Sequence, residues 1–403
     1  MAREGPSGAN GAGRQWLIGG VRSPFGKFCG GLRELPLVEL AQHVLDELFE
    51  RFPGYRERLG EMHVGVAMLE GGLMVPARQI AFAAGLPETL PTLTVDRACC
   101  SGMTAAGLAR RALRDGASVT VALGAESMSR TPRLLHETRW GRRRGELVVE
   151  DLLMLRSPVA GTSIAQYAGH EALTRGVGRT DQDAWALRSH QRYFSAAAAG
   201  YFDDEIVPVA TPAGPVDADE QPRPDVTAEK LAALPTVYDS PTVTAGNAPG
   251  LNDGACALLL GDDAAAADAP SAPLAVISSY MQIAGGATAA VYLPGQAIDG
   301  LVEAAGLTPA DLDVIEINEA FAATAVTSLK TLAGGDAGLE RELAQRTNVN
   351  GGAVAIGHPT GASGARITLT AARELERRDG RWAAAAICGG FGQTDAVLLE
   401  RVA

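Results

Sequence analysis

Cys99 has the local sequence expected of a nucleophile. It stands where the β-rich run Thr94-Val95 gives way to a helical stretch of small residues that opens near Ser101-Gly102. The first amides of a helix point unpaired N–H groups along the axis, so a sulfur there lies in positive potential that favours a thiolate, and the same amides can hold an oxyanion. Burial acts in the opposite direction, because an apolar site raises the pKa of a thiol, so this chemistry requires a neighbouring base.

His358 has the setting of a candidate base. It is one of six histidines and is flanked by Gly357 and Pro359 in a loop after residues 353–356, which fixes the ring while leaving one face open. The remaining histidines have no such setting and are interpreted as surface or structural residues: His43, His63, His136, His170 and His190.

Two further polar residues follow apolar runs. Cys388 ends the run 383–387, which predicts a place at the carboxyl edge of a central strand, where α/β proteins hold their sites. The glycines that follow it, Gly389, Gly390 and Gly392, allow backbone amides to approach a ligand closely, whereas a lone cysteine would otherwise be core packing. Asn318 lies between a strand ending at residue 317 and a helix over 320–332, where it could be simply a helix N-cap.

These residues must be positioned by an alternation of strands and helices, which favours an α/β fold with a mostly parallel sheet system. The middle of the chain, about 128–252, differs and is interpreted as a large insertion that contains the basic run 139–144 and the proline-rich stretch 216–225. The dipeptides Ser101-Gly102 and Ser363-Gly364 form a faint repeat that two related halves would explain. Strands are expected over 62–69, 91–95, 119–123, 255–260, 312–317 and 383–388, and helices over 37–52, 102–113 and 364–376.

Composition limits the functional class. A chain of 403 residues predicts two or three domains, and its 48 glycines with 5% aromatic residues indicate closely packed helices and strands. The net charge of −12 argues against a nucleic-acid surface, and no apolar run approaches the roughly 18 residues that span a bilayer.

The cysteines and the N-terminus indicate a cytoplasmic protein. Five unpatterned cysteines suit free thiols in a reducing compartment, and residues 1–13 are glycine-rich without the apolar core of a signal peptide, so they are expected to form a mobile tail. Cys100, Cys256 and Cys29 are predicted to be buried packing residues, since a disulfide between the adjacent Cys99 and Cys100 would be strained. Neither CxxC nor HExxH occurs, so no metal is implied, and there is no GxxxxGK[ST] loop.

Taken together, the motifs resemble the thiolase family (acetyl-CoA acyltransferases and acetyltransferases), and the resemblance covers nearly the whole chain in family order. The four motifs with catalytic residues are Cys99-Cys100-Ser101-Gly102, Asn318-Glu319-Ala320-Phe321, Gly357-His358-Pro359 and Cys388-Gly389-Gly390-Phe391-Gly392. Supporting matches are Arg22-Ser23-Pro24-Phe25-Gly26, Glu126-Ser127-Met128-Ser129, Thr244-Ala245-Gly246-Asn247-Ala248 and residues 348–366.

The resemblance implies a five-layered αβαβα thiolase fold with two related halves and an inserted loop domain. The expected N-terminal half covers residues 1–127, with 253–272 returning to it, and the C-terminal half covers 273–403. The loop domain, 128–252, is expected to bind CoA and to contact other subunits, which implies a homodimer or a homotetramer.

By the same resemblance, His358 activates Cys99, and Cys388 is the second acid/base. The amides of Cys99 and Gly390 form an oxyanion hole, and Asn318 holds a water that stabilises an enolate oxygen together with the histidine. The implied reaction is 3-ketoacyl-CoA thiolysis or its reverse, the condensation of two acyl-CoAs. Coenzyme A is then a substrate, and no permanently bound cofactor is implied.

The predicted substrate contacts are Arg223, Ala248, Pro249 and Phe321. Arg223 matches a position where thiolases often place an arginine near the nucleotide end of CoA. The arginines at 139 and 142–144 could attract phosphate, but a basic run is more often a solvated face.

Three departures from the family pattern affect this reading. Pro249 replaces a serine that usually lies beside the pantetheine arm, so one donor is missing. Val159-Ala160 replaces a His-Met pair of biosynthetic acetoacetyl-CoA thiolases, which predicts a roomier pocket and substrates longer than acetoacetyl-CoA. Asp96 replaces a frequent asparagine, and its charge could oppose thiolate formation at Cys99.

Two alternatives stay open at this point. A ketoacyl synthase of the same fold would pair its cysteine with His-His or His-Asn and lacks a second catalytic cysteine, so Cys388 speaks against it. A non-catalytic acyl-CoA or lipid-binding relative would keep the fold without turnover, which the four filled catalytic positions disfavour.

Overall fold

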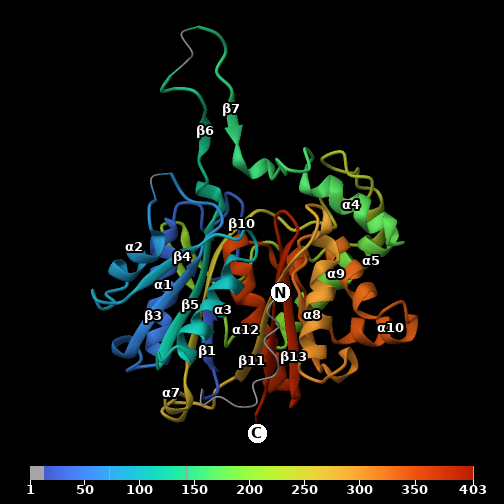
Figure 1. The fold of residues 1–403 in the computed structure, drawn as a ribbon. Helices are drawn as coiled ribbons and strands as arrows, with labels where there is room; N and C mark the ends of the chain where they lie inside the picture. The colour runs from blue at the N-terminus through green and yellow to red at the C-terminus, as the bar shows by residue number, and fades with distance from the viewer. Residues whose placement is uncertain (1–12, 72, 141–143, 403) are drawn as a thin grey trace.

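The computed structural model describes residues 13–71, 73–140 and 144–402. The predicted N-terminal tail, except for Gly13, lies outside the described residues, and so do Arg142 and Arg143. Strands of the N-terminal half stand side by side on one flank of the body and those of the C-terminal half on the other (Figure 1). The strands are β1 (Trp16–Arg22), β2 (Gly26–Lys27), β3 (Leu59–Gly65), β4 (Thr92–Val95), β5 (Val119–Ser127), β6 (Arg133–Leu135), β7 (Val149–Asp151), β8 (Val209–Thr211), β9 (Gly214–Val216), β10 (Asn252–Gly261), β11 (Ala275–Ala284), β12 (Val314–Ile317), β13 (Trp382–Gly389) and β14 (Gln393–Glu400).

The helices fill the intervals between these strands. They are α1 (Leu37–Arg51), α2 (Pro76–Ala83), α3 (Ser101–Arg114), α4 (Ile164–Thr174), α5 (Arg179–Ala198), α6 (Ala228–Ala232), α7 (Asp263–Ala267), α8 (Leu293–Ala304), α9 (Ala322–Leu332), α10 (Ala337–Arg346), α11 (Ala353–Ile356) and α12 (Thr360–Arg378). No helix in these described ranges is long and apolar enough to cross a bilayer.

The main sheet is mixed, so the prediction of a mostly parallel sheet is wrong. Its strand order is β12-β13-β14-β11-β1-β10-β5-β3-β4, and only β3 with β4, β3 with β5, and β12 with β13 run parallel. An apolar run indicates that both faces of a strand are buried, but it does not indicate whether the strand runs parallel or antiparallel to its neighbour. At β13 and β14 the direction follows from the short connection 390–392, which leaves room only for an antiparallel hairpin.

The two halves of the sheet meet over a very short edge. β1 pairs with β11 at two positions only, Trp16 with Val276 and Leu17 with Ala275, whereas β10 pairs with β5 along nine. Each half therefore behaves as a sheet of its own, and helices can lie between the two.

Helices α3 and α12 form the central layer (Figure 1). They pack very closely, because a Cβ on Gly102 of α3 would come within 2.5 Å of the Gly361 carbonyl oxygen, and one on Gly364 of α12 within 2.5 Å of the Met103 nitrogen. The faint repeat in the sequence thus marks the two small-residue helix starts that pack together at the centre of the molecule.

The outer layers complete the five-layered αβαβα arrangement, which confirms the predicted fold class. Helices α1 and α2 cover the N-terminal sheet through one apolar cluster, and α8, α9 and α10 pack with the C-terminal sheet through another. A third cluster joins α3 and α12 to both sheets.

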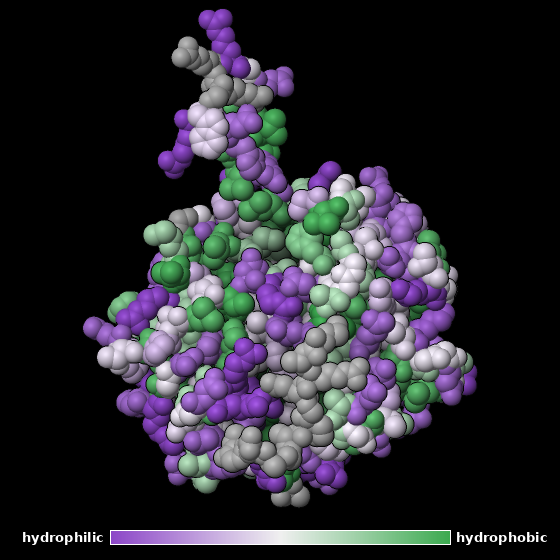
Figure 2. All heavy atoms as spheres, in the orientation of Figure 1, coloured by the Kyte–Doolittle hydropathy of each residue, from purple (hydrophilic) through white to green (hydrophobic). Residues whose placement is uncertain are grey.

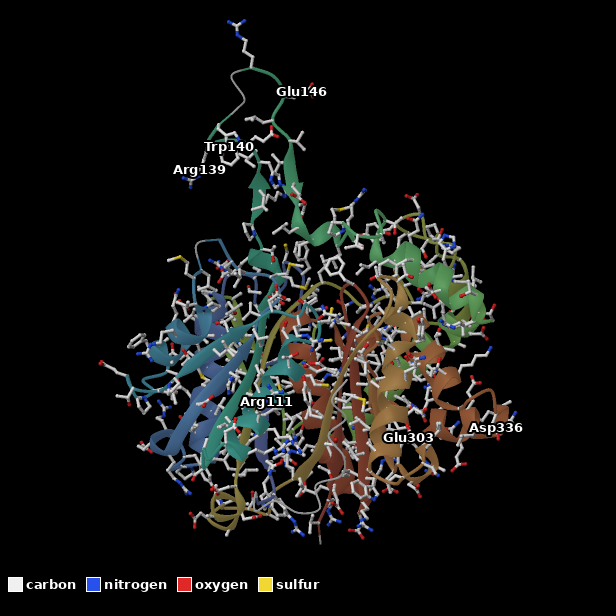
Figure 3. The ribbon with its side chains drawn as sticks, viewed as in Figure 1. Arg111, Arg139, Trp140, Glu146, Glu303 and Asp336 are labelled. Atoms are coloured by element: carbon white, nitrogen blue, oxygen red, sulfur yellow. The ribbon has the colours of Figure 1, made fainter. Side chains whose placement is uncertain are left out.

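The segment between β5 and β10 wraps around this body: α4 lies at its upper end in Figure 1, α5 packs on α9 and α11, and Val207 and Val209 join the apolar cluster of the N-terminal sheet. It contains α4, α5, α6 and two small hairpins, and the hairpin β6–β7 projects away from the body, with Arg139, Trp140 and Glu146 near its tip (Figures 1 and 3). Hydrophobic side chains gather on the body directly below this projection (Figure 2).

Candidate active site

Cys99 lies in a tight loop between β4 and α3. Ala98 has a φ of +51°, and Cys100 is the residue that precedes the first helical turn, so Cys99 lies just outside the turn in which the sequence placed it. The Ser101 hydroxyl holds this loop by accepting from the Arg97 amide at 2.9 Å and donating to the Ala98 carbonyl at 2.6 Å. The loop leaves the Cys99 side chain partly exposed.

Cys388 is the second-last residue of β13, as the sequence predicted. It faces Thr394 of β14 across the hairpin, and burial raises the pKa of its thiol to about 12. The Gly390 amide that follows donates to no backbone carbonyl among the described residues, so it is available to a ligand.

Cys99 and Cys388 line the same cavity, which has a volume of about 370 Å³. They come from positions 289 residues apart and from different halves of the sheet. The other lining residues are Ala67, Met68, Ala98, Glu150, Asp151, Leu152, Met154, Leu155, Arg156, Ser157, Ile164, Tyr167, Ala168, Ala290, Val291, Ala320, Phe321, Thr324, Thr360, Gly389, Gly390 and Phe391.

His358 is held in one orientation beside this cavity, two residues before Thr360 in its wall. Its amide donates to the Asn252 side chain at 2.9 Å, and Gly357 (φ +109°) packs so tightly on Asn252 that a Cβ would lie 2.6 Å from it. The Ser363 hydroxyl donates to the Pro359 carbonyl at 2.9 Å and therefore accepts from His358 Nδ1 at 2.6 Å. The proton is thereby placed on Nδ1, which leaves Nε2 unprotonated and able to act as a base.

Asn318 contacts the basic nitrogen of this histidine. Its Nδ2 lies 3.4 Å from His358 Nε2, and its Oδ1 is buried without a hydrogen-bond partner among the described residues. The helix after it, α9, begins at Ala322 with Phe321 as its N-cap, so Asn318 is not the N-cap that its sequence allowed. Its side-chain oxygen is therefore free for another role.

Burial keeps both the Cys99 thiol and the His358 imidazole uncharged. Burial, with smaller contributions from the negative charges of Cys388 and Glu126, raises the pKa of the Cys99 thiol well above its usual value. Burial and the nearby Arg366 guanidinium lower the pKa of His358 to about 3. A thiolate at Cys99 therefore needs proton transfer to a base in place, as expected from the sequence.

Glu126 ties the histidine loop to the cavity wall, a role that its motif did not reveal. Its buried carboxylate accepts from the Thr360 hydroxyl, from the Gly361 amide at 2.8 Å and from the Met68 amide at 2.9 Å. Burial raises its pKa to about 7 in spite of these bonds.

A second unpredicted cluster joins the nucleophile loop to β14. Arg97 forms an ion pair with the fully buried Asp395 and donates to Gln393 at 3.1 Å, and Asp395 also accepts from Thr104 and from Tyr280 at 2.6 Å. Asp395 pairs with the residue before Cys388 in the sheet, so this cluster connects the chain near one sulfur to the chain near the other.

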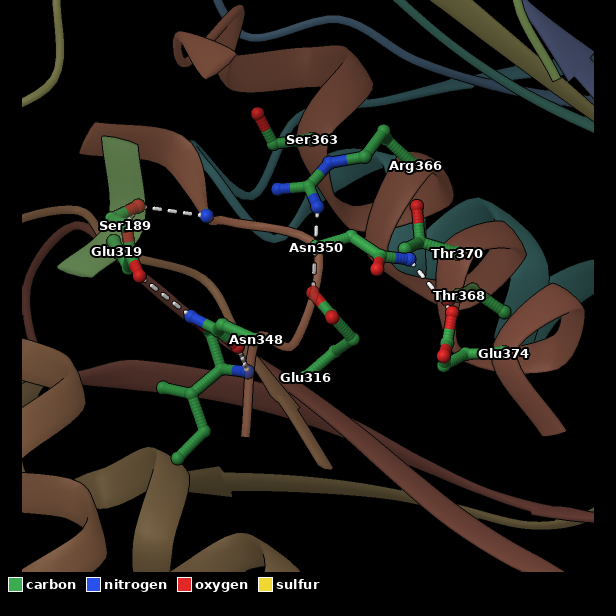
Figure 4. Close-up of polar contacts among 12 residues, drawn as sticks. Ser189, Glu316, Glu319, Asn348, Asn350, Ser363, Arg366, Thr368, Thr370 and Glu374 are labelled. Atoms are coloured by element: carbon green, nitrogen blue, oxygen red, sulfur yellow. Dashed lines mark hydrogen bonds and ion pairs between the residues drawn. The ribbon is translucent and has the colours of Figure 1, made fainter. Parts of the chain in front are cut away.

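Glu319, the residue after Asn318, belongs to a buried polar network (Figure 4). Glu319 accepts from the Asn348 side chain at 2.9 Å and from the Ser189 hydroxyl of α5 at 2.8 Å. The Asn348 side chain also bonds to the backbone of Ile317, so the chain is held on both sides of Asn318. Arg366 of α12 pairs with Glu316 of β12 at 3.4 Å, with both side chains fully buried.

Of the four predicted substrate contacts, two lie at or beside the cavity and two do not line it. Phe321 lines the cavity, and Ala248 packs beside it in the same apolar cluster. Pro249 is half-buried, and Arg223 is exposed and donates its amide to His190; neither lines the cavity.

The structure also places the remaining cysteines. Cys100 and Cys256 are buried, as predicted, but Cys29 is exposed in the loop after β2, so its prediction as packing is wrong. Cys29 has a positive φ of 57° and is followed by two glycines, and its neighbour Phe28 is exposed as well. No cluster of metal-ligating side chains occurs in the described part of the chain.

Comparison with known proteins gives matches over almost the whole chain. The family model for the thiolase N-terminal domain matches residues 16–264, and that for the thiolase C-terminal domain matches residues 271–401. An acetyl-CoA acetyltransferase of Chromobacterium violaceum is 38% identical, with 96% of this chain and 99% of the relative covered. A beta-ketoadipyl-CoA thiolase of Pseudomonas knackmussii is 39% identical over the same shares.

Solved structures agree with this result. Human mitochondrial 3-ketoacyl-CoA thiolase superposes with a TM-score of 0.91 at 32% identity, with 97% of this chain and 100% of that chain covered. The same human enzyme has also been solved in complex with CoA, with a TM-score of 0.91.

Proposed function

The chain belongs to the thiolase family, and from this premise we propose that it transfers acyl groups reversibly between Cys99 and coenzyme A. The observation that carries the proposal is the single cavity lined by both Cys99 and Cys388. A nucleophile and a separate acid/base around one small space are what cleavage of a 3-ketoacyl-CoA requires.

In the cleavage direction, His358 Nε2 takes the proton from Cys99, and the sulfur attacks C3 of the 3-ketoacyl-CoA. The C2–C3 bond then breaks, the acyl group stays on Cys99, and the acetyl-CoA enolate is protonated by Cys388. The thiol of coenzyme A gives its proton to the Cys388 thiolate, and its sulfur attacks the acyl-cysteine. The C–S bond to Cys99 breaks, the new acyl-CoA leaves, and the Cys99 sulfur takes back the proton held by His358. Run in reverse, the same steps condense two acyl-CoAs.

Two oxyanions need donors in this scheme. We assign the oxyanion of the acyl-cysteine step to the amides of Cys99 and Gly390. Neither amide donates a hydrogen bond to a backbone carbonyl among the described residues. We assign the enolate oxygen to His358 and to a water bound by Asn318, which would donate hydrogen bonds to it. The unpartnered Asn318 Oδ1 supports such a water.

Coenzyme A is proposed as a substrate, with Arg223, Ala248 and Pro249 along its path. The exposed Arg223 side chain is available to a phosphate, and Ala248 packs against the cavity cluster that contains Phe321. The acyl group is proposed to be longer than acetoacetyl. The cavity volume supports this, although Val159 is 72% exposed and does not itself form the wall.

We further propose a homodimer or homotetramer in the cytoplasm, with a degradative role in fatty acid β-oxidation as one pathway. The exposed apolar side chains of the projecting hairpin, such as Leu135, Trp140, Leu147 and Val148, support a subunit contact. Five free thiols support a reducing compartment.

The decisive experiment exposes the protein to acyl-CoAs of several lengths and locates the attached acyl group by mass spectrometry. We expect acylation at Cys99, loss of the label on addition of coenzyme A, and CoA-dependent cleavage of 3-ketoacyl-CoAs. Acylation without CoA-dependent cleavage would favour a ketoacyl synthase or a binding protein, but Cys388 beside Cys99 argues for the thiolase.

A further inference from the structure

Four hydroxyl side chains interrupt the apolar wall of the cavity, and two of them have partners: Ser157 accepts from the Ala160 amide at 3.0 Å, and Thr360 donates to Glu126. The other two are Tyr167 and Thr324. Tyr167 of α4 is 7% exposed and Thr324 of α9 is 1% exposed, and both line the cavity. Neither hydroxyl forms a hydrogen bond with any residue that the structure describes. Because a buried hydroxyl without a partner is unfavourable, such groups normally bind a water or a ligand.

The Tyr167 phenol lies close to the reacting sulfurs. Burial raises its pKa, and negative charge on Cys388 and on Cys99 raises it further, so its oxygen is within electrostatic range of both. It packs in the same apolar cluster as Cys388 and Phe321. An acyl chain that extends from Cys99 into this cavity therefore shares the space with the Tyr167 hydroxyl.

The oxygens of the reaction itself already have donors. The thioester and enolate oxygens are assigned to the amides of Cys99 and Gly390 and to His358 with Asn318. A partner for Tyr167 and Thr324 must therefore be a further oxygen on the acyl chain or a water.

On the basis of the proposed function, we propose that Tyr167 and Thr324 form a polar subsite that binds an oxygen substituent on the acyl chain beyond the 3-keto group. The natural substrates are then 3-ketoacyl-CoAs that carry a hydroxyl or a carbonyl farther along the chain. Two hydroxyls match such a group because each can both donate and accept a hydrogen bond.

The occupant is a neutral oxygen rather than a carboxylate. The charged lining residues all lie on the 150–156 segment, and they are two acids, Glu150 and Asp151, with one base, Arg156. The base is exposed, so no buried cation among the described lining residues would compensate a carboxylate taken into the apolar interior.

The test uses pairs of 3-ketoacyl-CoAs of equal chain length, one unsubstituted and one with a hydroxyl or oxo group at C5, C6 or C7. For the wild-type enzyme we expect kcat/KM to be about tenfold higher for the best oxygenated member, which is the effect of one well-placed hydrogen bond. Tyr167→Phe and Thr324→Val should bring this ratio close to one, whereas Thr324→Ser, which keeps a hydroxyl, should preserve most of it. Tyr201→Phe is the matched control, because Tyr201 lies outside the cavity and its loss should leave the ratio as in the wild type.

A binding measurement separates this proposal from the assigned reaction. Calorimetry with Cys99→Ala protein compares the Kd values of the same pairs, with and without Tyr167→Phe, and requires no turnover. A tenfold Kd ratio that disappears with Tyr167→Phe supports the subsite even if no 3-ketoacyl-CoA is cleaved, in which case the proposed function alone fails. Equal Kd values within each pair, a ratio unaffected by both hydroxyl deletions, or tighter binding of a chain ending in a carboxylate would each overturn the subsite as proposed.

Discussion

Asp395→Asn tests whether the ion pair between the two halves sets the geometry of the site. The Asp395 side chain is fully buried, and its partner Arg97 is 20% exposed. Removing one member of a buried pair typically costs about 3–5 kcal/mol. Because Arg97 keeps its bond to Gln393 and reaches some solvent, we expect a loss of about 2–3 kcal/mol in the free energy of unfolding.

The same substitution should lower activity more than it lowers binding. Arg97 lies two residues before Cys99, and Asp395 pairs with the residue before Cys388, so loss of the pair changes the separation of the two sulfurs. A misplacement of about 1 Å commonly reduces a rate about 100-fold. We therefore expect kcat to fall by about that factor, with KM for coenzyme A nearly unchanged, because the predicted CoA contacts lie elsewhere.

The assay combines urea unfolding with steady-state kinetics on a 3-ketoacyl-CoA. Asp268→Asn is the control, since it removes a surface ion pair with Arg58 and should change stability by less than about 1 kcal/mol. If Asp395→Asn keeps both wild-type stability and a kcat within twofold of wild type, this ion pair does not position the sulfurs.

Three further predictions concern the chemistry and its pH dependence. Cys99→Ser should reduce kcat by several orders of magnitude in the thiolysis assay, because an alkoxide is far harder to form than a thiolate, and near-normal activity would exclude covalent catalysis by sulfur. If the cavity takes longer chains, kcat/KM for 3-ketoacyl-CoAs of six or more carbons should exceed that for acetoacetyl-CoA, and a strict preference for acetoacetyl-CoA would reject the idea. His358 is neutral when folded but protonates near pH 6.5 when unfolded, so it lowers stability as pH falls from 6.5 towards 3, by on the order of 4 kcal/mol. The contribution of Glu126 to the pH dependence of stability has the opposite sign. Its pKa is raised to about 7, so stability is lost as pH rises from 4.5 to 7. Urea unfolding between pH 4.5 and 6.5 should therefore show a steeper rise of stability with pH for Glu126→Gln and a shallower one for His358→Gln, and identical slopes in all three proteins would contradict the pKa shifts.

Local sequence predicted the elements that carry the two cysteines. The apolar run 383–388 became β13, Trp382–Gly389, and the small-residue stretch after Cys99 became α3, Ser101–Arg114. Such patterns report burial on one or both faces of an element, and burial is a local consequence of residue type. Strand direction was not predicted, because it depends on which distant strand lies alongside.

The residues that sequence reasoning missed have partners far away in the chain. Glu126 bonds to Thr360 across 234 positions, and Arg97 bonds to Asp395 across 298. Nothing in the immediate surroundings of these residues distinguishes a buried carboxylate from a solvated one. The motif Glu126-Ser127-Met128-Ser129 marked the position, but only the fold shows that it fixes the start of α12 beside His358.

The neutral resting state of the thiol and imidazole follows from the same burial that shapes the cavity. A standing thiolate–imidazolium pair would place two charges in a site that raises the pKa of Cys99 and lowers that of His358. Proton transfer is therefore favourable only when the new charge passes on to an oxyanion, which in the proposed mechanism the Cys99 and Gly390 amides hold. In the proposed mechanism, deprotonation of Cys99 is thus coupled to the arrival of a thioester or a ketone at those amides.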